Sequence, residues 1–421
     1  MQTDSVPTRA GAERLDAADP LAGFRDRFVV TDPDLIYLDG NSLGRLPLAT
    51  AERLRTVVER EWGGDLVRAW PRWIERPALT GDLIGTGLLG AAPGQVVVSD
   101  STTVNLYKLA AAALDARPGR TVIVTDDDNF PTDRYVLAGL AGARGLELRL
   151  LASDPVGGPD PAAVAAALGP EVALVSLSAV AYRSGALAAM GAINRAAHDA
   201  GALTLWDLSH AAGAVPLALD ADGTDLAVGC TYKYLHGGPG APAFLYVRRE
   251  LQPSLRSPIQ GWFGQRDQFA MGSRYEPAEG VTRFLTGTPD VIGLAAVEEG
   301  ARIVAEAGPE RLAAKSAALT AMMIALADAW LAPLGFTVAT PRDPARRAGH
   351  VALASPDAWP VCQALADRGV VGDFRGPDRL RLGPVPLTTS FTQVWDAFAL
   401  LSDLVAAGEH TAYPREPGRV T

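Results

Sequence analysis

The sequence predicts an α/β protein that has a mostly parallel sheet and, toward its C-terminal end, a smaller α/β domain. Short apolar runs alternate with helical segments between residues 96 and 200, and this alternation is typical of βαβ units. After about Pro289 the pattern changes to two long helices followed by shorter elements. With 421 residues, 48% of them hydrophobic, the chain is long and apolar enough for two cores.

The individual elements follow from local patterns. A first strand is predicted at residues 35–38, and a helix over residues 47–62 because apolar residues recur there at helical spacing. We expect the face with Leu54, Val57, Val58 and Trp62 to be buried. Five strands of the larger unit are predicted at residues 96–98, 121–124, 148–151, 172–177 and 202–206. The smaller unit is predicted to contain helices at 291–306 and 311–330, a strand at 335–338, a helix through Cys362 and a strand at 380–382.

Charge and cysteine content exclude several classes of protein. The formal net charge is −10 and no basic tract compensates for it, so we expect neither a nucleic acid nor a membrane as partner. Cys230 and Cys362 are too few for a disulfide framework, and no Cys/His cluster has metal-ligand spacing, so no metal is expected. Residues 1–28 contain no continuous apolar segment. The protein is predicted to be cytoplasmic.

Lys233 is the most informative residue for function. It lies between two tyrosines, Tyr232 and Tyr234, before a Gly/Pro-rich turn, and the upstream apolar run ends in Asp207. An acid followed by a lysine is the order expected of a pyridoxal 5'-phosphate (PLP) enzyme, because the lysine holds the cofactor as a Schiff base and the acid keeps the pyridine nitrogen protonated. Taken singly, the lysine would be interpreted as an exposed side chain and the aspartate as a helix cap. Together with the motifs below they favour the cofactor.

Two strand-to-helix junctions carry residues suited to the same cofactor. Thr102 and Thr103 precede a helix, where hydroxyl and free backbone N–H groups can bind a phosphate, although an ordinary helix cap uses the same residue types. Phe130 can stack on a pyridine ring, with Asp133 as a polar contact, although Pro131 and Asp133 also suit any helix start.

Five motifs together resemble the kynureninase family, which belongs to the PLP-dependent fold-type-I enzymes of the aspartate aminotransferase superfamily. The motifs are YLDGNSLG at 37–44, DLSHAAG at 207–213, TYKY at 231–234, GWFG at 261–264 and GPVPL at 383–387. The resemblance covers nearly the whole chain. It implies a large domain with a mostly parallel seven-stranded sheet and a smaller C-terminal α/β domain. The implied limits are 1–45 for an N-terminal segment that contributes to the small domain and the active-site loop, 46–290 for the large domain and 291–421 for the small domain.

The resemblance also implies the roles of the site residues. The catalytic group would be Lys233, Tyr232 and Asp207. Cofactor contacts are expected from Thr102, Thr103, Phe130, Asp133, Asp207, His210, Tyr232, Lys233, Trp262 and Thr288, the last from the other subunit of a homodimer with shared active sites. Substrate contacts are expected from Arg381, Asn41, Ser42, Trp70 and Gly287. Arg381 would clamp the substrate α-carboxylate, the alternative being a surface arginine.

Two further details of the implied site concern its aryl pocket and one departure from the family. Trp70, Trp262 and Phe263 are candidates for the aryl pocket, although Trp70 suits core packing equally well. Ala181 stands where the family pattern has an amide side chain. This departure bears on a secondary polar contact and leaves the cofactor residues in place.

The implied reaction is the hydrolytic Cβ–Cγ cleavage of L-kynurenine to anthranilate and L-alanine, with 3-hydroxykynurenine as a poorer substrate. Such an enzyme would serve the kynurenine pathway of tryptophan catabolism and NAD biosynthesis, or supply anthranilate to a biosynthetic route. The alternatives are another enzyme on this scaffold, such as a cysteine desulfurase or an aminotransferase, and a non-catalytic PLP-fold protein. A desulfurase requires a mobile nucleophilic cysteine, which neither Cys230 nor Cys362 resembles. A binding module does not require a lysine poised for covalent chemistry.

Overall fold

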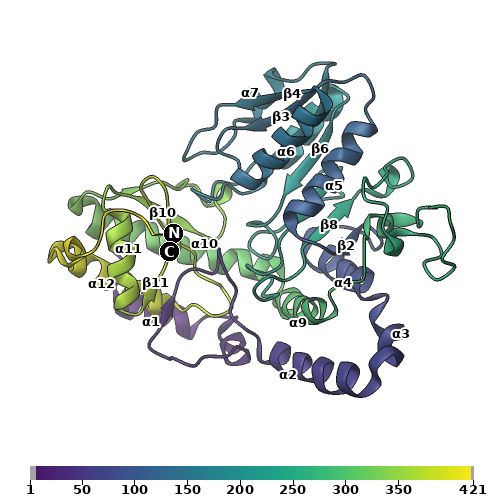
Figure 1. Ribbon diagram of the computed structural model, residues 1–421. Coiled ribbons are helices and arrows are strands. Elements are labelled where there is room, and N and C mark those ends of the chain that lie inside the picture. Colours follow the sequence, from purple (N-terminus) through teal and green to yellow (C-terminus); the bar gives the residue numbers. More distant parts are fainter. Residues whose placement is uncertain (1–5, 419–421) are drawn as a thin grey trace.

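The structure is a computed structural model that describes residues 6–418, so the ends of the predicted terminal segments, 1–5 and 419–421, lie outside the described residues. A seven-stranded sheet forms the larger of two units (Figure 1). In spatial order its strands are β2 (Val96–Val98), β8 (Phe244–Val247), β7 (Leu226–Gly229), β6 (Leu203–Asp207), β5 (Val172–Ser178), β3 (Val122–Asp126) and β4 (Glu147–Leu151). Only β8 runs against the other six strands. The prediction of a mostly parallel sheet is therefore confirmed.

Helices cover both faces of this sheet, and the strands are apolar on both sides. Val97, Ile123 and Leu205 point to the face under α5 (Thr102–Asp115) and α6 (Pro131–Arg144). The alternate residues, among them Val96, Val122 and Trp206, point to the other face. There they meet α4 (Arg76–Ile84), α8 (Met190–Asp199) and α9 (Val291–Ala307). Such two-sided burial is what keeps a parallel sheet stable, because side chains alternate between faces along a strand.

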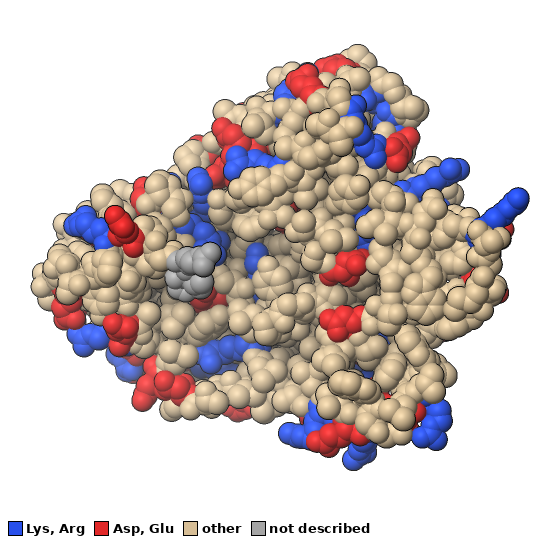
Figure 2. Space-filling model, viewed as in Figure 1, with Lys and Arg blue, Asp and Glu red and all other residues tan. Residues whose placement is uncertain are grey.

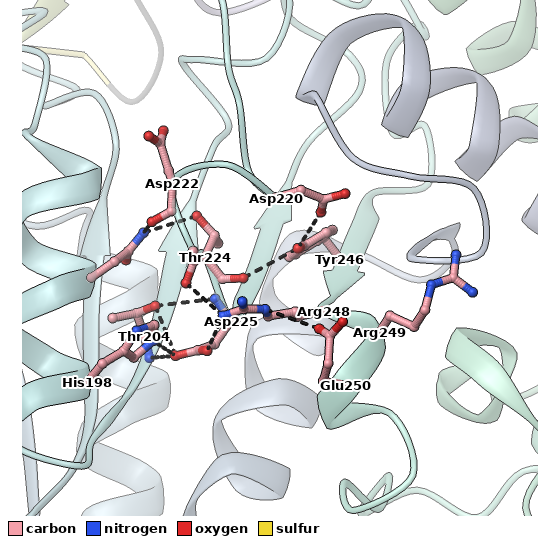
Figure 3. Close-up of polar contacts among 12 residues, drawn as sticks. His198, Thr204, Asp220, Asp222, Thr224, Asp225, Tyr246, Arg248, Arg249 and Glu250 are labelled. Carbon is pink, nitrogen blue, oxygen red and sulfur yellow. Dashed lines mark hydrogen bonds and ion pairs between the residues drawn. The ribbon is translucent and has the colours of Figure 1, made fainter.

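The amino ends of the central strands are closed by a polar network (Figure 3). Asp225, which precedes β7, accepts hydrogen bonds from the backbone N–H of Thr204 at 2.9 Å and lies 2.9 Å from the Nε2 of His198. Tyr246 donates its hydroxyl to Asp220 at 2.9 Å in the same region. In open parallel sheets, ligands bind at the opposite edge, where the parallel strands end.

The smaller unit is built on a four-stranded antiparallel sheet in the order β12 (Asp373–Arg375), β13 (Arg379–Leu382), β10 (Val351–Ala354) and β9 (Thr337–Val338). Its helices are α10 (Pro309–Leu326), α11 (Ala358–Asp367) and α12 (Phe391–Ala406). The N-terminal segment joins this unit, because β1 (Ile36–Tyr37) pairs with β11 (Val370–Val371) and α1 (Arg9–Ala17) packs on α12. Asp16 at the end of α1 caps α12 by accepting from the N–H groups of Phe391 and Thr392.

Two helices bear on the domain limits and on the membrane question. The α9 helix packs in the core of the large sheet, whereas α10 belongs to the core of the small unit. The limits 45/46 and 290/291 stay predictions, and this packing favours a boundary near Gly308.

The segment Pro309–Leu334 is long and apolar enough to cross a membrane by length and composition alone. Since Leu319 and Met323 of α10 are fully buried in the small core, we interpret it as a core helix.

The helix at 47–62 packs on α9, but the expectation that Val58 and Trp62 belong to its buried face is wrong. The α2 helix (Leu48–Thr56) continues to Asp65 in wider turns of the π type, so residues at a spacing of 3.6 no longer lie on one face. Val57 is buried, but Val58 and Trp62 are 43% and 57% exposed. The segment leads to the short helix α3 (Trp70–Trp73) and lies at the edge of the molecule (Figure 1).

Candidate active site

The carboxyl ends of β3, β5 and β6 open into a cavity of about 280 Å³. Eight residues predicted to hold the cofactor line it: Thr102, Thr103, Phe130, Asp133, Asp207, His210, Tyr232 and Lys233. Ser101 and Gly240, which belong to the same predicted helix start and Gly/Pro-rich turn, also line it, and the sequence reasoning missed five more: Thr132, Ser178, Tyr182, Ser209 and Ala241. Convergence of several strand ends is what brings together side chains that are far apart in the chain.

Lys233 and its neighbours form the reactive end of the cavity. The Nζ of Lys233 lies 2.9 Å from the Nε2 of His210. Burial lowers the pKa of Lys233, although the nearby Cys230 and Asp207 act in the opposite direction. Burial also lowers the pKa of His210 well below its usual value, and the charge of Lys233 adds to this effect. His210 is therefore neutral, and Lys233 has a larger share of the unprotonated amine that covalent chemistry requires.

Two buried carboxylates lie at the other side of the lysine. Asp207 ends β6 and accepts a hydrogen bond from the Ser209 N–H at 2.8 Å. Burial raises the pKa of Asp207, and burial together with the charge of Asp207 raises that of Asp133. The Oδ2 of Asp133 and the Nδ1 of His210 have no hydrogen-bond partner among the described residues. Because Asp133 has an oxygen without a hydrogen-bond partner and two carboxylates lie near one lysine, this part of the cavity favours a positively charged atom of a ligand.

The opposite end of the cavity suits an anion. Thr102 and Thr103 stand in the first turn of α5, a helix of 14 residues whose N-cap, Ser101, accepts from the Val104 N–H. Free N–H groups and the positive end of the helix dipole favour a phosphate there. Phe130 is 39% exposed, with its ring edge-on to Tyr182 at 5.3 Å between centroids. The donor set therefore fits PLP: an anion site, an aromatic ring, carboxylates for the pyridine nitrogen and a lysine.

Arg381 lies deep between the two units and is 1% exposed, so the alternative of a surface arginine is wrong. It faces Asp373 across the β12–β13 ladder. Its Nε donates to Asp373 Oδ1 at 2.8 Å, its Nη2 donates to Asp373 and Ser42, and its Nη1 donates to the Tyr182 carbonyl. Asp373 also pairs with Arg375 at 2.8 Å. Asp373 thus fixes the plane of the Arg381 guanidinium. Figure 2 shows basic side chains along the hollow between the two units.

The loop at residues 39–44 closes the site from the N-terminal side. A Cβ on Gly44 would lie 2.3 Å from the Lys233 carbonyl, so only glycine allows this close approach to the catalytic turn. Asn41 is 0% exposed, and both atoms of its amide have no hydrogen-bond partner among the described residues. Burial and the charge of Asp373 raise the pKa of Asp39 to about 7. The structure therefore brings Ser42 into contact with Arg381, while the amide of Asn41 lies against Gly383.

Seven of the predicted site residues do not line this cavity: Asn41, Ser42, Trp70, Trp262, Gly287, Thr288 and Arg381. Trp70 packs against Trp73 and Phe263, and Phe263 packs on Trp262. Phe263 is 1% exposed inside the core, so the expectation that it lines an aryl pocket is wrong: its ring is used to anchor this segment. Gly287 and Thr288 are exposed.

The sequence reasoning also missed His350, Tyr234 and Asp373. All three are buried close to Arg381. One signal was available, because the chain has only five histidines and His350 directly precedes an apolar strand. Within residues 6–418 no group of three or more His, Cys, Asp or Glu side chains could hold a metal ion.

Comparison with known proteins identifies the family. Residues 312–401 match the family model of the kynureninase C-terminal domain. Over 408 residues the chain is 43% identical to kynureninase from Pseudomonas fluorescens and 42% identical to kynureninase from Burkholderia pseudomallei (strain 1106a), and each alignment covers 95% of this chain and 96% of the relative. The chain belongs to the kynureninase family. Kynureninases are PLP-dependent hydrolases that act on a carbon–carbon bond, so the predicted cofactor and reaction class are confirmed.

Solved structures that resemble this kynureninase fold confirm the predicted fold type. A cysteine desulfurase from Thermococcus onnurineus NA1 superposes with a TM-score of 0.78 at 19% identity, covering 97% of this chain and 100% of that one. The cystine C–S lyase C-DES, solved with its reaction product cysteine persulfide, gives 0.76 at 18% identity and covers 88% and 98%. At these identities the likeness concerns the fold alone. The family assignment decides against the desulfurase alternative.

Proposed function

We propose that this enzyme cleaves L-kynurenine to anthranilate and L-alanine, with PLP held in the cavity at the carboxyl ends of the sheet. The observation that carries the proposal is that the cavity containing the buried Lys233 lies next to the buried Arg381. Arg381 and the cavity meet at Tyr182, whose side chain lines the cavity and whose carbonyl accepts from Arg381. An amino acid bound beside Lys233 could thus place its carboxylate at Arg381.

The residues around the cofactor have separate tasks in this proposal. Lys233 would hold PLP covalently, Asp207 would pair with the pyridine nitrogen and Asp133 would contact the ring. The hydroxyls of Thr102 and Thr103 would bind the phosphate. PLP supplies an electron-accepting ring that stabilises negative charge on carbons next to the substrate nitrogen. A carboxylate beside the ring nitrogen strengthens this effect, because it favours the protonated form of the nitrogen.

Proton transfer is assigned to Lys233 and Tyr232. Once the substrate amine has displaced it, Lys233 has an unprotonated amine that can take the α-proton and return it, since burial lowers its pKa. Tyr232 keeps its proton, because burial raises the pKa of its hydroxyl, and it lines the cavity beside Lys233. We assign it the donation of a proton to the alanine half after the carbon–carbon bond is cleaved. Neutral His210 holds the Nζ of Lys233 by the contact described above.

Recognition of the substrate carboxylate rests on Arg381, assisted by Ser42 and Asn41. The guanidinium is a planar donor fork that matches the two oxygens of a carboxylate. Asp373 occupies Nε and one N–H of Nη2, so a substrate carboxylate would share or replace the contacts of Nη1 with the Tyr182 carbonyl and of Nη2 with Ser42. The buried amide of Asn41, which lacks a partner among the described residues, offers a further contact.

We propose a homodimer in which Trp70, Trp262, Gly287 and Thr288 complete the cavity of the other subunit. Large apolar side chains near these residues are exposed, as expected for a surface that another chain covers. They include Trp62 (57%), Val67 (72%), Phe269 (58%) and Met271 (73%). A sedimentation experiment on the purified protein tests this proposal, and a monomer at micromolar concentration would contradict it.

We place the enzyme in the cytoplasm because Cys230 and Cys362 are both free thiols, which reducing compartments maintain. A role in tryptophan catabolism by the kynurenine pathway is the proposed physiological setting, since L-kynurenine is the proposed substrate.

The decisive experiment is substrate profiling of the PLP-loaded enzyme. We expect release of fluorescent anthranilate from L-kynurenine, together with one L-alanine for each anthranilate. Lys233→Ala should abolish turnover and the absorbance of the covalently held cofactor, while PLP can still bind noncovalently. Full activity of this variant would contradict the role of Lys233. Turnover of cysteine without turnover of L-kynurenine would contradict the proposed substrate.

A further inference from the structure

His350 is a fully buried histidine whose ring nitrogens lack hydrogen-bond partners. The side chain is 0% exposed, and neither Nδ1 nor Nε2 makes a hydrogen bond to any described residue. A buried polar atom without a partner costs about 1–3 kcal/mol, so in native proteins such atoms usually face a water, an ion or a ligand. His350 therefore needs a partner that the described chain does not provide.

His350 lies between the two halves of the active site. Its ring centroid is 5.6 Å from that of His210, and the Nε2 of His210 is 2.9 Å from the Nζ of Lys233. The charge of Arg381 acts on His350 from the other side. The Tyr182 carbonyl, which accepts from Arg381, also lies near the His350 ring but without the alignment of a hydrogen bond. His350 does not itself line the cavity; its ring lies next to His210, which does, and is close enough to Arg381 for that charge to act on it.

The fold holds the His350 ring firmly in this place. The residue directly precedes β10 and follows a short bridge between the two units, in which Ala348 N–H donates to the Gly185 carbonyl at 2.8 Å and Leu187 N–H donates to the Arg346 carbonyl at 2.9 Å. A Cβ on Gly185, whose φ is +75°, would lie 2.8 Å from the His350 carbonyl and 3.3 Å from its Nε2. Glycine at 185 thus leaves the room that the ring occupies.

The charges around the ring decide which chemical group it can bind. Burial and the charge of Arg381 lower the pKa of His350 to about 3, so at neutral pH the ring carries one N–H donor and one acceptor nitrogen. Asp373 acts in the opposite direction, but it is already paired with Arg381 and Arg375, and Lys233 adds positive charge nearby. An ammonium group is disfavoured here, whereas a negatively charged oxygen is favoured.

We propose that His350 donates a hydrogen bond from its ring N–H to the α-carboxylate of the amino-acid substrate, beside the fork of Arg381. This inference rests on the proposed cleavage of an α-amino acid in the cavity. The carboxylate would thus be held by two side chains of the small unit, one charged and one neutral. The neutral His350 ring would orient the carboxylate through a directional hydrogen bond. Because it adds no second positive charge, it would not strengthen the binding of unrelated anions.

The experiment compares ligands that represent the two halves of the substrate. L-Alanine carries the α-carboxylate and no aryl group, whereas 2-aminoacetophenone carries the aryl ketone and no α-carboxylate. Dissociation constants of both are measured by calorimetry on the PLP-loaded wild-type enzyme and on His350→Leu and His350→Gln, together with KM and kcat for L-kynurenine. The glutamine keeps an N–H donor in a side chain of similar reach. His198→Gln is the control, since His198 lies in the polar network at the opposite edge of the sheet.

We expect His350→Leu to weaken L-alanine binding and to raise KM for L-kynurenine by about tenfold or more, because a hydrogen bond to a charged group is lost. Binding of 2-aminoacetophenone and kcat should stay within about threefold of wild type. His350→Gln should restore L-alanine binding to within about threefold, and His198→Gln should match wild type.

Two results would overturn the proposal. L-Alanine binding within threefold of wild type in His350→Leu would mean that the ring faces only a water or has a purely structural role. An equal weakening of L-alanine and 2-aminoacetophenone would mean that the whole site is distorted. If the leucine variant does not fold, His350→Asn, with its shorter reach, is expected to weaken L-alanine selectively. Failure of the wild-type enzyme to cleave L-kynurenine would contradict the proposed function. This result is distinguished from the role of His350 because it is measured as wild-type turnover and not as ligand binding by the variants.

Discussion

Replacing Arg381 with lysine tests the substrate clamp, because it keeps the positive charge and removes the planar fork. The arginine contacts Asp373 through Nε and Nη2, Ser42 through Nη2 and the Tyr182 carbonyl through Nη1. A lysine has one nitrogen and cannot direct donors to both sides of the site. We expect the loss of at least one charge-assisted hydrogen bond to the α-carboxylate, about 1.5–3 kcal/mol, and thus a rise in KM of roughly 10- to 150-fold.

The assay follows anthranilate fluorescence over a range of L-kynurenine concentrations, with the visible absorbance of PLP recorded in parallel. The absorbance should not change, because Arg381 does not line the PLP cavity. Arg375→Lys is the matched control: this neighbour also pairs with Asp373, at 2.8 Å, and should leave KM within about threefold. An unchanged KM in Arg381→Lys, or an equal rise in both variants, would refute the assignment of the clamp to Arg381.

Three further predictions concern the cofactor, the pH dependence and the specificity. Asp207→Asn should lower kcat by several powers of ten, each about 1.4 kcal/mol, with little change in melting temperature, and a loss below tenfold would contradict its role at the ring nitrogen. KM for L-kynurenine should rise as pH passes about 7. Below that pH the raised pKa keeps Asp39 neutral, and above it the ionised Asp39 adds a negative charge beside the substrate carboxylate. Asp39→Asn should remove this rise in KM. The same raised pKa means that ionisation of Asp39 opposes folding, so its contribution to stability falls between pH 3.8 and about 7. L-Kynurenine should be preferred over 3-hydroxykynurenine by at most about a hundredfold, since an apolar pocket rejects a hydroxyl only weakly. The triple variant Trp70→His, Gly287→Ser and Thr288→Asn should raise kcat/KM for the hydroxylated substrate. A wild-type preference for 3-hydroxykynurenine would contradict the assignment of these residues to the aryl pocket.

The cofactor end of the site could be predicted from sequence because it depends on local patterns. Asp207 ends an apolar strand and Thr102 begins a helix after another strand, and parallel strands place all such ends at one edge. Strand β8, by contrast, runs antiparallel after a Gly/Pro-rich turn, which the alternation of strands and helices does not reveal. The exposure of Trp62 was missed for another local reason, since the widening of the helix after Thr56 leaves no mark in the apolar spacing.

The substrate end could not be predicted from local pattern, because pairing between distant segments creates it. Asp373 acquires its importance from the β12–β13 register, which places it opposite Arg381. No residue near Asp373 in the chain indicates this partner, and a shift of one residue in the register would turn its side chain to the other face. His350 likewise becomes part of the site only through the bridge that joins Ala348 to Gly185.

The two ends of the site carry opposite charge, and each is opposite to the group that it is proposed to bind. At the ring end, burial raises the pKa of both Asp133 and Asp207, and a cationic pyridine nitrogen beside them would favour their ionised forms. At the substrate end, Arg375 and Arg381 face Asp373 and a neutral Asp39, which leaves one positive charge for one carboxylate. A buried charge is stable only when it is paired. The unmatched positive charge at Arg375 and Arg381 therefore favours substrates with an α-carboxylate over ketones and amines that lack one.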